Sequence, residues 1–233
     1  QLFRFDTTGA MQNTIVENSR HIKKIAIHNS CKEKGEHRKC FTFCTRIVRG
    51  IIGNRKHLTY ISDKYEFDFE LEQTNQLADA LRSNNNNNGS IESYDFDEPN
   101  LTPVTFQPLW VALLHSGVRK IKFRNNNKFG MYDSTDNNNI DFTGMETNKS
   151  LKELDLSWFA MRKEEYQNLF HSIKKNKRLE KLELNYDTYK ELPEEMKRLF
   201  QEMMSENLTL LHCSLVCLPY VQDRIFEVIQ FHM

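Results

Sequence analysis

The chain contains nearly the same ten-residue phrase twice, and this repetition constrains the fold more than any other feature. Residues 148–157 read NKSLKELDLS and residues 176–185 read NKRLEKLELN, so the copies start 176 − 148 = 28 residues apart. Both have the pattern L-x-x-L-x-L, whose last two leucines alternate as one face of a short strand requires. An amphipathic helical stretch follows each copy, at residues 161–176 and 192–207. A unit of strand, turn and helix that recurs at this period predicts a solenoid.

Weaker copies of the pattern extend over nearly the whole chain. Their first apolar residues stand at positions 22, 58, 91, 118, 151, 179 and 210. Further helices are expected in the stretches between them and at the C-terminus, over residues 40–53, 71–84, 107–117 and 220–233. We therefore expect about seven irregular repeats in a single domain over residues 1–233. The chain begins with Gln1 rather than Met, so we expect it to be a fragment of a longer protein.

This pattern resembles the leucine-rich-repeat proteins, and the period of about 28 with a full helix per repeat is similar to the ribonuclease-inhibitor-like class. The resemblance implies an α/β solenoid with parallel strands on the concave face and helices on the convex face. The family carries Asn or Cys eight residues after the first leucine. That position falls on Ser30, Glu66, Pro99, Asn126, Phe159, Asp187 and Leu218. Only Asn126 matches, so we expect the family's asparagine ladder to be largely absent.

Two asparagine-rich stretches interrupt the pattern, at residues 83–90 and 125–139. They hold almost no apolar side chains to offset the entropy cost of ordering the chain. We expect both to be low-complexity loop insertions at the edges of repeats. The second replaces much of a helix, so its convex segment is expected to be short and poorly packed.

Composition and motifs exclude several classes of function. Lys+Arg and Asp+Glu number 32 each, so no whole-protein attraction to nucleic acid or anionic membrane is expected. No signal peptide and no apolar run of membrane-spanning length are visible. The five cysteines have no disulfide-framework spacing, which favours a reducing compartment. We expect an intracellular protein, cytoplasmic or nuclear, without membrane insertion, in which the four Asn-x-Ser/Thr sequons (Asn88, Asn100, Asn148 and Asn207) are accidental.

Catalytic and metal-binding signals are weak or absent. The phosphate-loop, dinucleotide, zinc-protease and nucleophile-elbow motifs do not occur. Residues 50–53 read Gly-Ile-Ile-Gly, similar to the backbone-clamping loop of KH domains, but two isoleucines suit that role poorly. One cysteine–histidine cluster lacks the tight cysteine pairs of structural zinc. Its members are Cys31, Cys40, Cys44, His21, His28 and His37. We expect no enzyme activity, no cofactor and no metal.

If the strands line a concave face, the residues between their leucines face a partner. The last three copies place there the candidate contact residues Lys152, Asp155, Lys181, Glu183 and His212. The aromatic residues Trp158, Phe159 and Tyr186, just past the strands, are candidate anchors for a partner. Alternatively, these aromatic residues pack beneath the strand-to-helix turns.

The fourth copy forms a possible basic patch of Arg119, Lys120, Lys122 and Arg124, which suggests nucleic-acid binding. In-register pairing would instead set acidic residues on both sides of these cations and cancel their field. The acidic neighbours are Glu92 and Asp95 on one side and Glu153 and Asp155 on the other.

These observations favour a non-catalytic protein–protein interaction scaffold, a subunit of a larger assembly. Two alternatives remain: the substrate-recognition region of a ubiquitin-ligase receptor, and a ribonucleoprotein component that binds nucleic acid through the basic patch.

Overall fold

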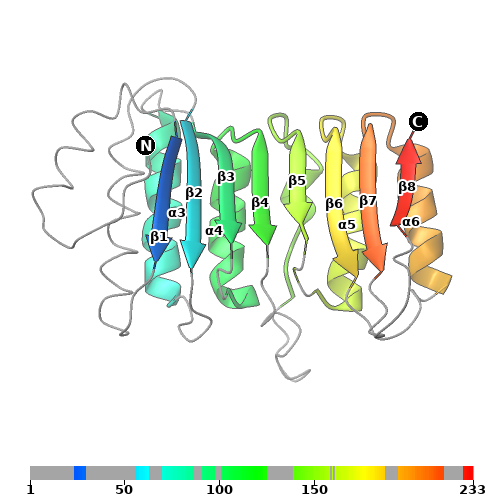
Figure 1. Cartoon of the computed structure of the whole chain (residues 1–233), viewed down its shortest axis with the longest axis horizontal. Coiled ribbons are helices and arrows are strands. Elements are labelled where there is room, and N and C mark those ends of the chain that lie inside the picture. Colours follow the sequence, from blue (N-terminus) through cyan, green and yellow to red (C-terminus); the bar gives the residue numbers. More distant parts are fainter. Residues whose placement is uncertain are drawn as a thin grey trace, which may run out of the picture.

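Eight strands form one sheet in which the spatial order follows the chain order (Figure 1). The computed structural model describes residues 24–29, 56–62, 70–86, 91–97, 101–124, 139–157, 159, 161–186, 194–217 and 228–232. The strands are β1 (Lys24–Asn29), β2 (Lys56–Ser62), β3 (Ile91–Asp97), β4 (Lys120–Arg124), β5 (Glu153–Leu156), β6 (Lys181–Tyr186), β7 (His212–Cys217) and β8 (Val228–His232). Every neighbouring pair is parallel except β7 and β8, which are antiparallel.

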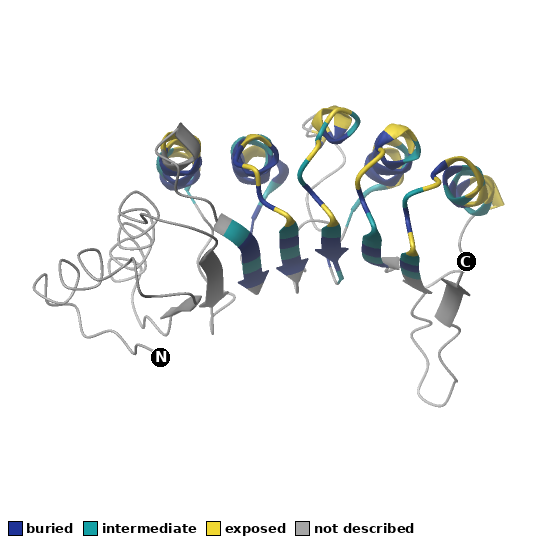
Figure 2. Cartoon of the chain, turned by 90° about the horizontal axis from the view of Figure 1, so that it is seen from above, coloured by how far each residue is buried: buried dark blue, intermediate teal, exposed yellow. Residues whose placement is uncertain are grey.

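Helical segments cover one face of this sheet. They are α3 (Leu71–Asn86), α4 (Pro103–His115), the 3₁₀ segment η3 (Thr143–Met145), α5 (Lys163–Lys175) and α6 (Glu194–Glu206). Figure 2 shows the helices along the outer side of an arch and the strands along its inner side. Short crossovers from one parallel strand to the next require this separation of layers. The expected curved α/β solenoid is therefore present in the described part of the chain.

The core lies between the two layers. The inward leucines of β5 and β6 are fully buried at Leu154, Leu156, Leu182 and Leu184. Near β3 and β4 many core side chains are aromatic, and the ring centroids of Phe106 of α4 and Phe123 lie 5.0 Å apart. Burial of large apolar side chains from α3 to β7 makes each of these repeats depend on its neighbours for stability.

Each of the first seven strands begins within two residues of a position predicted from the repeat pattern. Four of the connecting segments contain an α-helix, α3 to α6, and each follows a strand. The segment between β1 and β2 lies outside the described residues. The segment between β4 and β5 has η3 as its described helical element. The count of seven complete repeats therefore stays a prediction.

Three expectations about local structure need correction. Residues 220–233 were expected to form a helix, but β8 occupies Val228–His232 and pairs with β7. A short run of β-branched and aromatic residues fits either period, and pairing with an open sheet edge decides the outcome.

Residues 83–90 were expected to be a loop, but the last turn of α3 extends to Asn86. Its preceding turns are anchored by buried Leu77 and Leu81, and adding a turn to an existing helix costs little.

The described part of the segment before β5 is well packed, in contrast to the poor packing expected. Ile140, Phe142 and Met145 are each fully buried. Trp110 of α4 lies 5.4 Å from Phe142 between ring centroids, in an edge-on arrangement. These apolar side chains form the described outer layer of this repeat. Of the predicted insertion at 125–139, Asn139 alone lies within the described residues.

Candidate functional site

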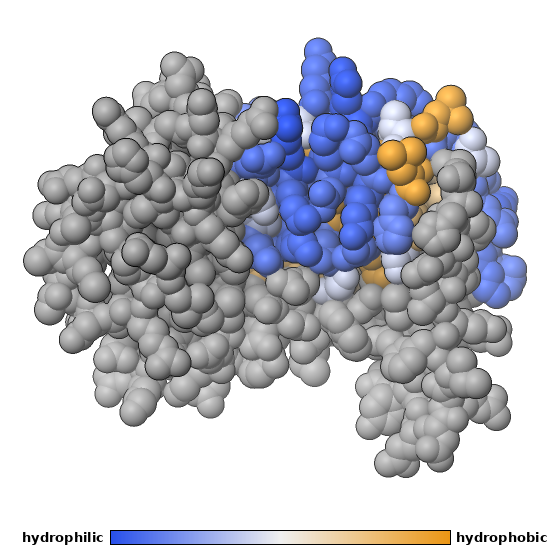
Figure 3. Space-filling model, turned by 45° about the horizontal axis from the view of Figure 1, so that its top comes forward, coloured by the Kyte–Doolittle hydropathy of each residue, from blue (hydrophilic) through white to orange (hydrophobic). Residues whose placement is uncertain are grey.

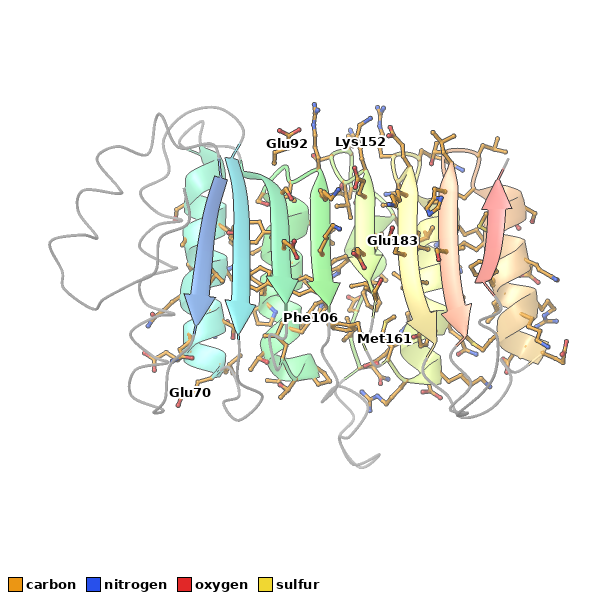
Figure 4. The ribbon with its side chains drawn as sticks, in the orientation of Figure 1. Glu70, Glu92, Phe106, Lys152, Met161 and Glu183 are labelled. Atoms are coloured by element: carbon orange, nitrogen blue, oxygen red, sulfur yellow. The ribbon has the colours of Figure 1, made fainter. Side chains whose placement is uncertain are left out.

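The strand face opposite the helices carries two rows of polar side chains across β4 to β7. Strand side chains alternate between faces, so the residues between the buried leucines point to this inner face. The register gives one row of Lys120, Glu153, Lys181 and His212. It gives a second row of Lys122, Asp155, Glu183 and Ser214. We call these eight residues the strand face; Figure 4 labels Glu183 among them.

Ion pairs link the charged members of the strand face to one another. Lys120 contacts the carboxylate of Glu153 on the next strand. Lys181 Nζ lies 2.6 Å from Glu183 Oε1, two residues along the same strand. The hydrogen bond from Lys181 to Glu183, with the nearby carboxylates of β5, raises the pKa of Lys181. Charges of both signs thus hold each other in place and leave the strand face nearly neutral.

Asp155 has a structural role in this network. Asp155 is 5% exposed, and its carboxylate accepts a hydrogen bond of 3.0 Å from the backbone N–H of Ser157. Lys122 Nζ lies 3.4 Å from the same carboxylate. A carboxylate this enclosed is stabilised by its own partners and has little surface to offer another protein. We therefore remove Asp155 from the set of predicted contact residues.

Three of the four cations of the predicted basic patch have described acidic partners. Arg119 Nη1 lies 3.9 Å from Glu92 Oε1, and Asp95 stands in register with Lys122. On the other side Lys120 and Lys122 meet the carboxylates of β5. The side chain of Arg124 lies outside the description. The expected neutralisation by in-register neighbours is thus observed for Arg119, Lys120 and Lys122.

The remaining predicted contact residues are partly exposed or outside the described side chains. Lys152 is exposed at the start of β5 and pairs with Glu180 (labelled Lys152, Figure 4). His212 is half-buried and stands opposite His232 of β8. Trp158 and the side chain of Tyr186 lie outside the description. Phe159 is fully buried, 5.0 Å from Phe106 between ring centroids, so it is a core residue and not an anchor for a partner.

Sequence reasoning missed a ladder of asparagines at the turns that lead from helix to strand. Asn148, Asn176 and Asn207 each stand three residues before the first leucine of a repeat, in NKSL, NKRL and NLTL. The Oδ1 atom of Asn176 accepts hydrogen bonds of 2.7 Å from both backbone N–H groups of its turn, at Arg178 and Leu179. Its Nδ2 donates to the backbone carbonyl of Met145 at 2.6 Å.

The two neighbouring asparagines make the same set of bonds. Asn148 donates to the carbonyl of Leu114, and Asn207 donates to the carbonyl of Ile173, each at 2.6 Å. Each asparagine thereby donates to a carbonyl at the end of the preceding helical segment. We call these three residues the asparagine ladder. This ladder stands at the helix-to-strand turns and not at the family's position eight residues after the first leucine, so the expectation that the family's own ladder is largely absent stays a prediction.

The ladder also explains two of the four sequons. The amide of Asn207 is fully buried and its nitrogen is engaged by two carbonyl groups. The amide of Asn148 is likewise committed to its turn and to Leu114. Glycosylation needs an accessible amide nitrogen. Both asparagines therefore serve the fold, while Asn88 and Asn100 lie outside the described residues.

Several other candidates from the sequence fall outside the description. The side chains of the cysteine–histidine cluster and the Gly-Ile-Ile-Gly stretch at 50–53 lie outside the described residues. Cys213 is described: it is a free, buried cysteine, and burial raises the pKa of its thiol to about 12. Within the described residues no helix is long and apolar enough to cross a membrane.

The strand face is shallow where β4, β5 and β6 meet. The hollow between Lys122, Asp155, Lys181 and Glu183 has a volume of about 10 Å³, which is room for about one water molecule. Small-molecule sites are concave cavities of several hundred cubic ångströms. This hollow is therefore much smaller than a typical small-molecule site.

The repeated leucine-lined parallel strands, each followed by an outer helical segment, define a leucine-rich-repeat-like fold. No protein-family model matches the sequence, and no curated protein matches it. Among solved structures, the chain is similar to the tropomodulin C-terminal domain of Caenorhabditis elegans, with a TM-score of 0.49 and 11% sequence identity. That similarity covers 87% of this chain and 93% of the other.

Proposed function

We propose that this chain is a non-catalytic protein–protein interaction scaffold of the ribonuclease-inhibitor-like class, with seven repeats, and that a partner binds its strand face. The observation that carries the proposal is the internal pairing of charges on a shallow surface. Side chains already held by ion pairs lose little further freedom on binding, which lowers the entropy cost of association. The role we favour is that of a subunit in a larger assembly inside the cell.

The composition of the strand face supports a protein partner. The face presents Lys120, Glu153, Lys181 and Glu183, two charges of each sign, all part-exposed. A partner with an alternating charge pattern meets attraction at each position, whereas a partner of a single sign meets repulsion at half of them. Nucleic acid is a partner of a single sign. Its binding to β4 is disfavoured because the cations there already have carboxylate partners.

The experiment is affinity purification of the tagged chain, divided into nuclease-treated and untreated halves. We expect stoichiometric protein partners that survive nuclease treatment. The informative variant exchanges the members of one ion pair, Lys181→Glu with Glu183→Lys. The exchange keeps the pair but reverses the charge pattern that faces a partner, so we expect the partners to be lost while the fold is kept.

The matched control exchanges an ion pair on the convex helices. Lys163 of α5 contacts Glu195 of α6, so Lys163→Glu with Glu195→Lys makes the same kind of change away from the strand face. We expect this control to retain every partner. Partners that disappear with nuclease treatment, or that survive the strand-face exchange and not the helix exchange, would contradict the proposal.

A further inference from the structure

An apolar spot lies at one edge of the solenoid, where the turn after α6 leads into β7. Leu208 is 81% exposed and Leu211 is 64% exposed. Figure 3 shows hydrophobic atoms gathered at this edge beside strongly hydrophilic ones. Single exposed leucines are common, but two large aliphatic side chains three residues apart in one turn form a local patch. Neither side chain is needed for packing against the core.

The two preceding turns are charged at the same positions. The asparagine ladder fixes the alignment, since Asn207 Nδ2 donates to the carbonyl of Asn176 at 3.0 Å and Asn176 Nδ2 to that of Asn148 at 3.2 Å. The residue after each asparagine is therefore Lys149, Lys177 and Leu208 in successive turns. Cations stand directly beside the leucines along the edge.

The charge of this edge is strongly positive. Residues 146–152, 174–180 and 205–211 together contain six Lys and Arg and three Glu, a difference of 6 − 3 = +3. The three glutamates are Glu146, Glu180 and Glu206, and each already pairs with a lysine. Among the described residues, no ion pair is found for the three exposed cations Lys149, Lys177 and Arg178. This contrasts with the strand face, where the charges cancel.

We infer that this edge, formed by Lys149, Lys177, Arg178, Leu208 and Leu211, docks an acidic segment of another protein that also carries a large apolar side chain. Leucines bury the apolar group and the cations pair with the carboxylates. Neighbouring turns follow the strand spacing of roughly 4.8 Å, so the cations lie roughly 5 and 10 Å from the leucines. An extended segment advances about 3.3 Å per residue, so its acidic residues would stand within about three positions of the apolar one.

The same edge has room for the segment to continue. Beyond Lys149 lies an open polar hollow of about 360 Å³, lined by residues that include His115, Gly117, Gly144 and Ser150. The exposed leucines argue against nucleic acid, because a phosphate backbone gains nothing from aliphatic side chains. They argue equally against docking of a second copy face to face, because that would bring the unpaired cations of two chains together.

The test is selection of a phage-displayed library of random dodecapeptides on the purified full chain, followed by fluorescence anisotropy of the enriched peptides. We expect enriched sequences with an apolar residue and neighbouring acidic ones. We expect Leu208→Ser with Leu211→Ser, and separately Lys149→Gln with Lys177→Gln and Arg178→Gln, to weaken their binding by roughly tenfold or more. Because all five side chains are exposed, these variants keep the fold, which circular dichroism verifies.

The strand-face exchange of Lys181 and Glu183 is the control, and it leaves peptide binding unchanged. The inference is overturned if no such peptides are enriched, or if the leucine variant binds them as well as the unaltered chain. It is also overturned if a mixed-sequence single-stranded RNA binds and is lost only on neutralising the cations, or if sedimentation velocity shows a dimer that the leucine variant dissolves. Because the two surfaces are tested by different variants, failure here leaves the proposed function standing.

Discussion

The side-chain amide of Asn207 donates a hydrogen bond of 3.0 Å to the backbone carbonyl of Asn176, one repeat earlier. Asn176 makes the equivalent bond to Asn148, so a continuous chain of amide-to-carbonyl bonds runs along the helix-to-strand edge. Repeat solenoids are held together by contacts between neighbouring repeats. This ladder supplies the polar part of those contacts, and the buried leucines of the strands supply the apolar part.

Replacing the central asparagine with alanine will destabilise the protein. Asn176→Ala removes the two hydrogen bonds that Oδ1 accepts from backbone N–H groups and the two that Nδ2 donates to carbonyls, all fully or partly shielded from water. Because buried polar groups are left unpaired, we expect the free energy of unfolding to fall by roughly 2–4 kcal/mol. Urea denaturation measures this change. Asn168→Ala, at an exposed position of α5, is the control and changes stability by about 0.5 kcal/mol or less.

Substitutions of Lys122 and Lys152 compare how much an enclosed and an exposed ion pair contribute to stability. Lys122→Met leaves the enclosed carboxylate of Asp155 without its cation, and we expect a loss of roughly 1–2 kcal/mol. Lys152→Met breaks an exposed pair with Glu180, and we expect a loss of about 0.5 kcal/mol or less. Equal losses in urea denaturation of the two variants would show that the network on the strand face has no special role in stability.

Phe159 will act on stability rather than on binding. It is fully buried against Phe106 and Phe123, so Phe159→Ala leaves a cavity and costs roughly 3–5 kcal/mol. Phe159→Leu fills most of that space and costs about 1–2 kcal/mol, while partner binding by the folded fraction is unchanged. A variant of Phe159 with normal thermal stability and lost partner binding would contradict its assignment to the core.

Cys213 will resist alkylation in the folded state. Burial raises the pKa of its thiol to about 12, so the reactive thiolate is scarce at pH 8. Iodoacetamide treatment followed by site-resolved mass spectrometry should modify Cys213 only after denaturation. Because the folded pKa lies above the unfolded one, the thiol's contribution to stability is complete below the unfolded pKa and is lost as the pH rises from about 9 towards 12. Cys213→Val removes this part of the pH dependence.

The strand positions could be predicted from the sequence because leucine spacing determines which face of a strand is buried. The repeats that begin at Leu151 and Leu179 run into β5 and β6, as the pattern requires. The role of Asn148, Asn176 and Asn207 was visible in the same phrases but was not predicted. The three asparagines recur at the repeat spacing, but their role depends on carbonyl groups more than 25 residues away, which the spacing alone does not identify.

The site was predicted less well than the fold. The register gave the correct neighbours for Arg119 and Lys122, because parallel in-phase repeats bring equivalent positions together. It did not reveal that Asp155 is enclosed, since enclosure depends on how closely Lys122 and the turn at Ser157 pack around it. Nor did it reveal β8, whose formation depends on an open sheet edge rather than on local periodicity.

The central claim is that a protein partner covers the strand face, and chemical footprinting of lysines tests it most directly. Lys181 of the strand face and Lys152 beside it have side-chain exposures of 40% and 46%, closely matched by 40% and 44% for Lys197 and Lys163 on the convex helices. Acetylation rates are measured on the chain alone and on its purified, nuclease-treated complex. We predict that Lys152 and Lys181 become protected while Lys163 and Lys197 react as before. Protection confined to Lys163 and Lys197 would contradict the claim and place the partner on the helices.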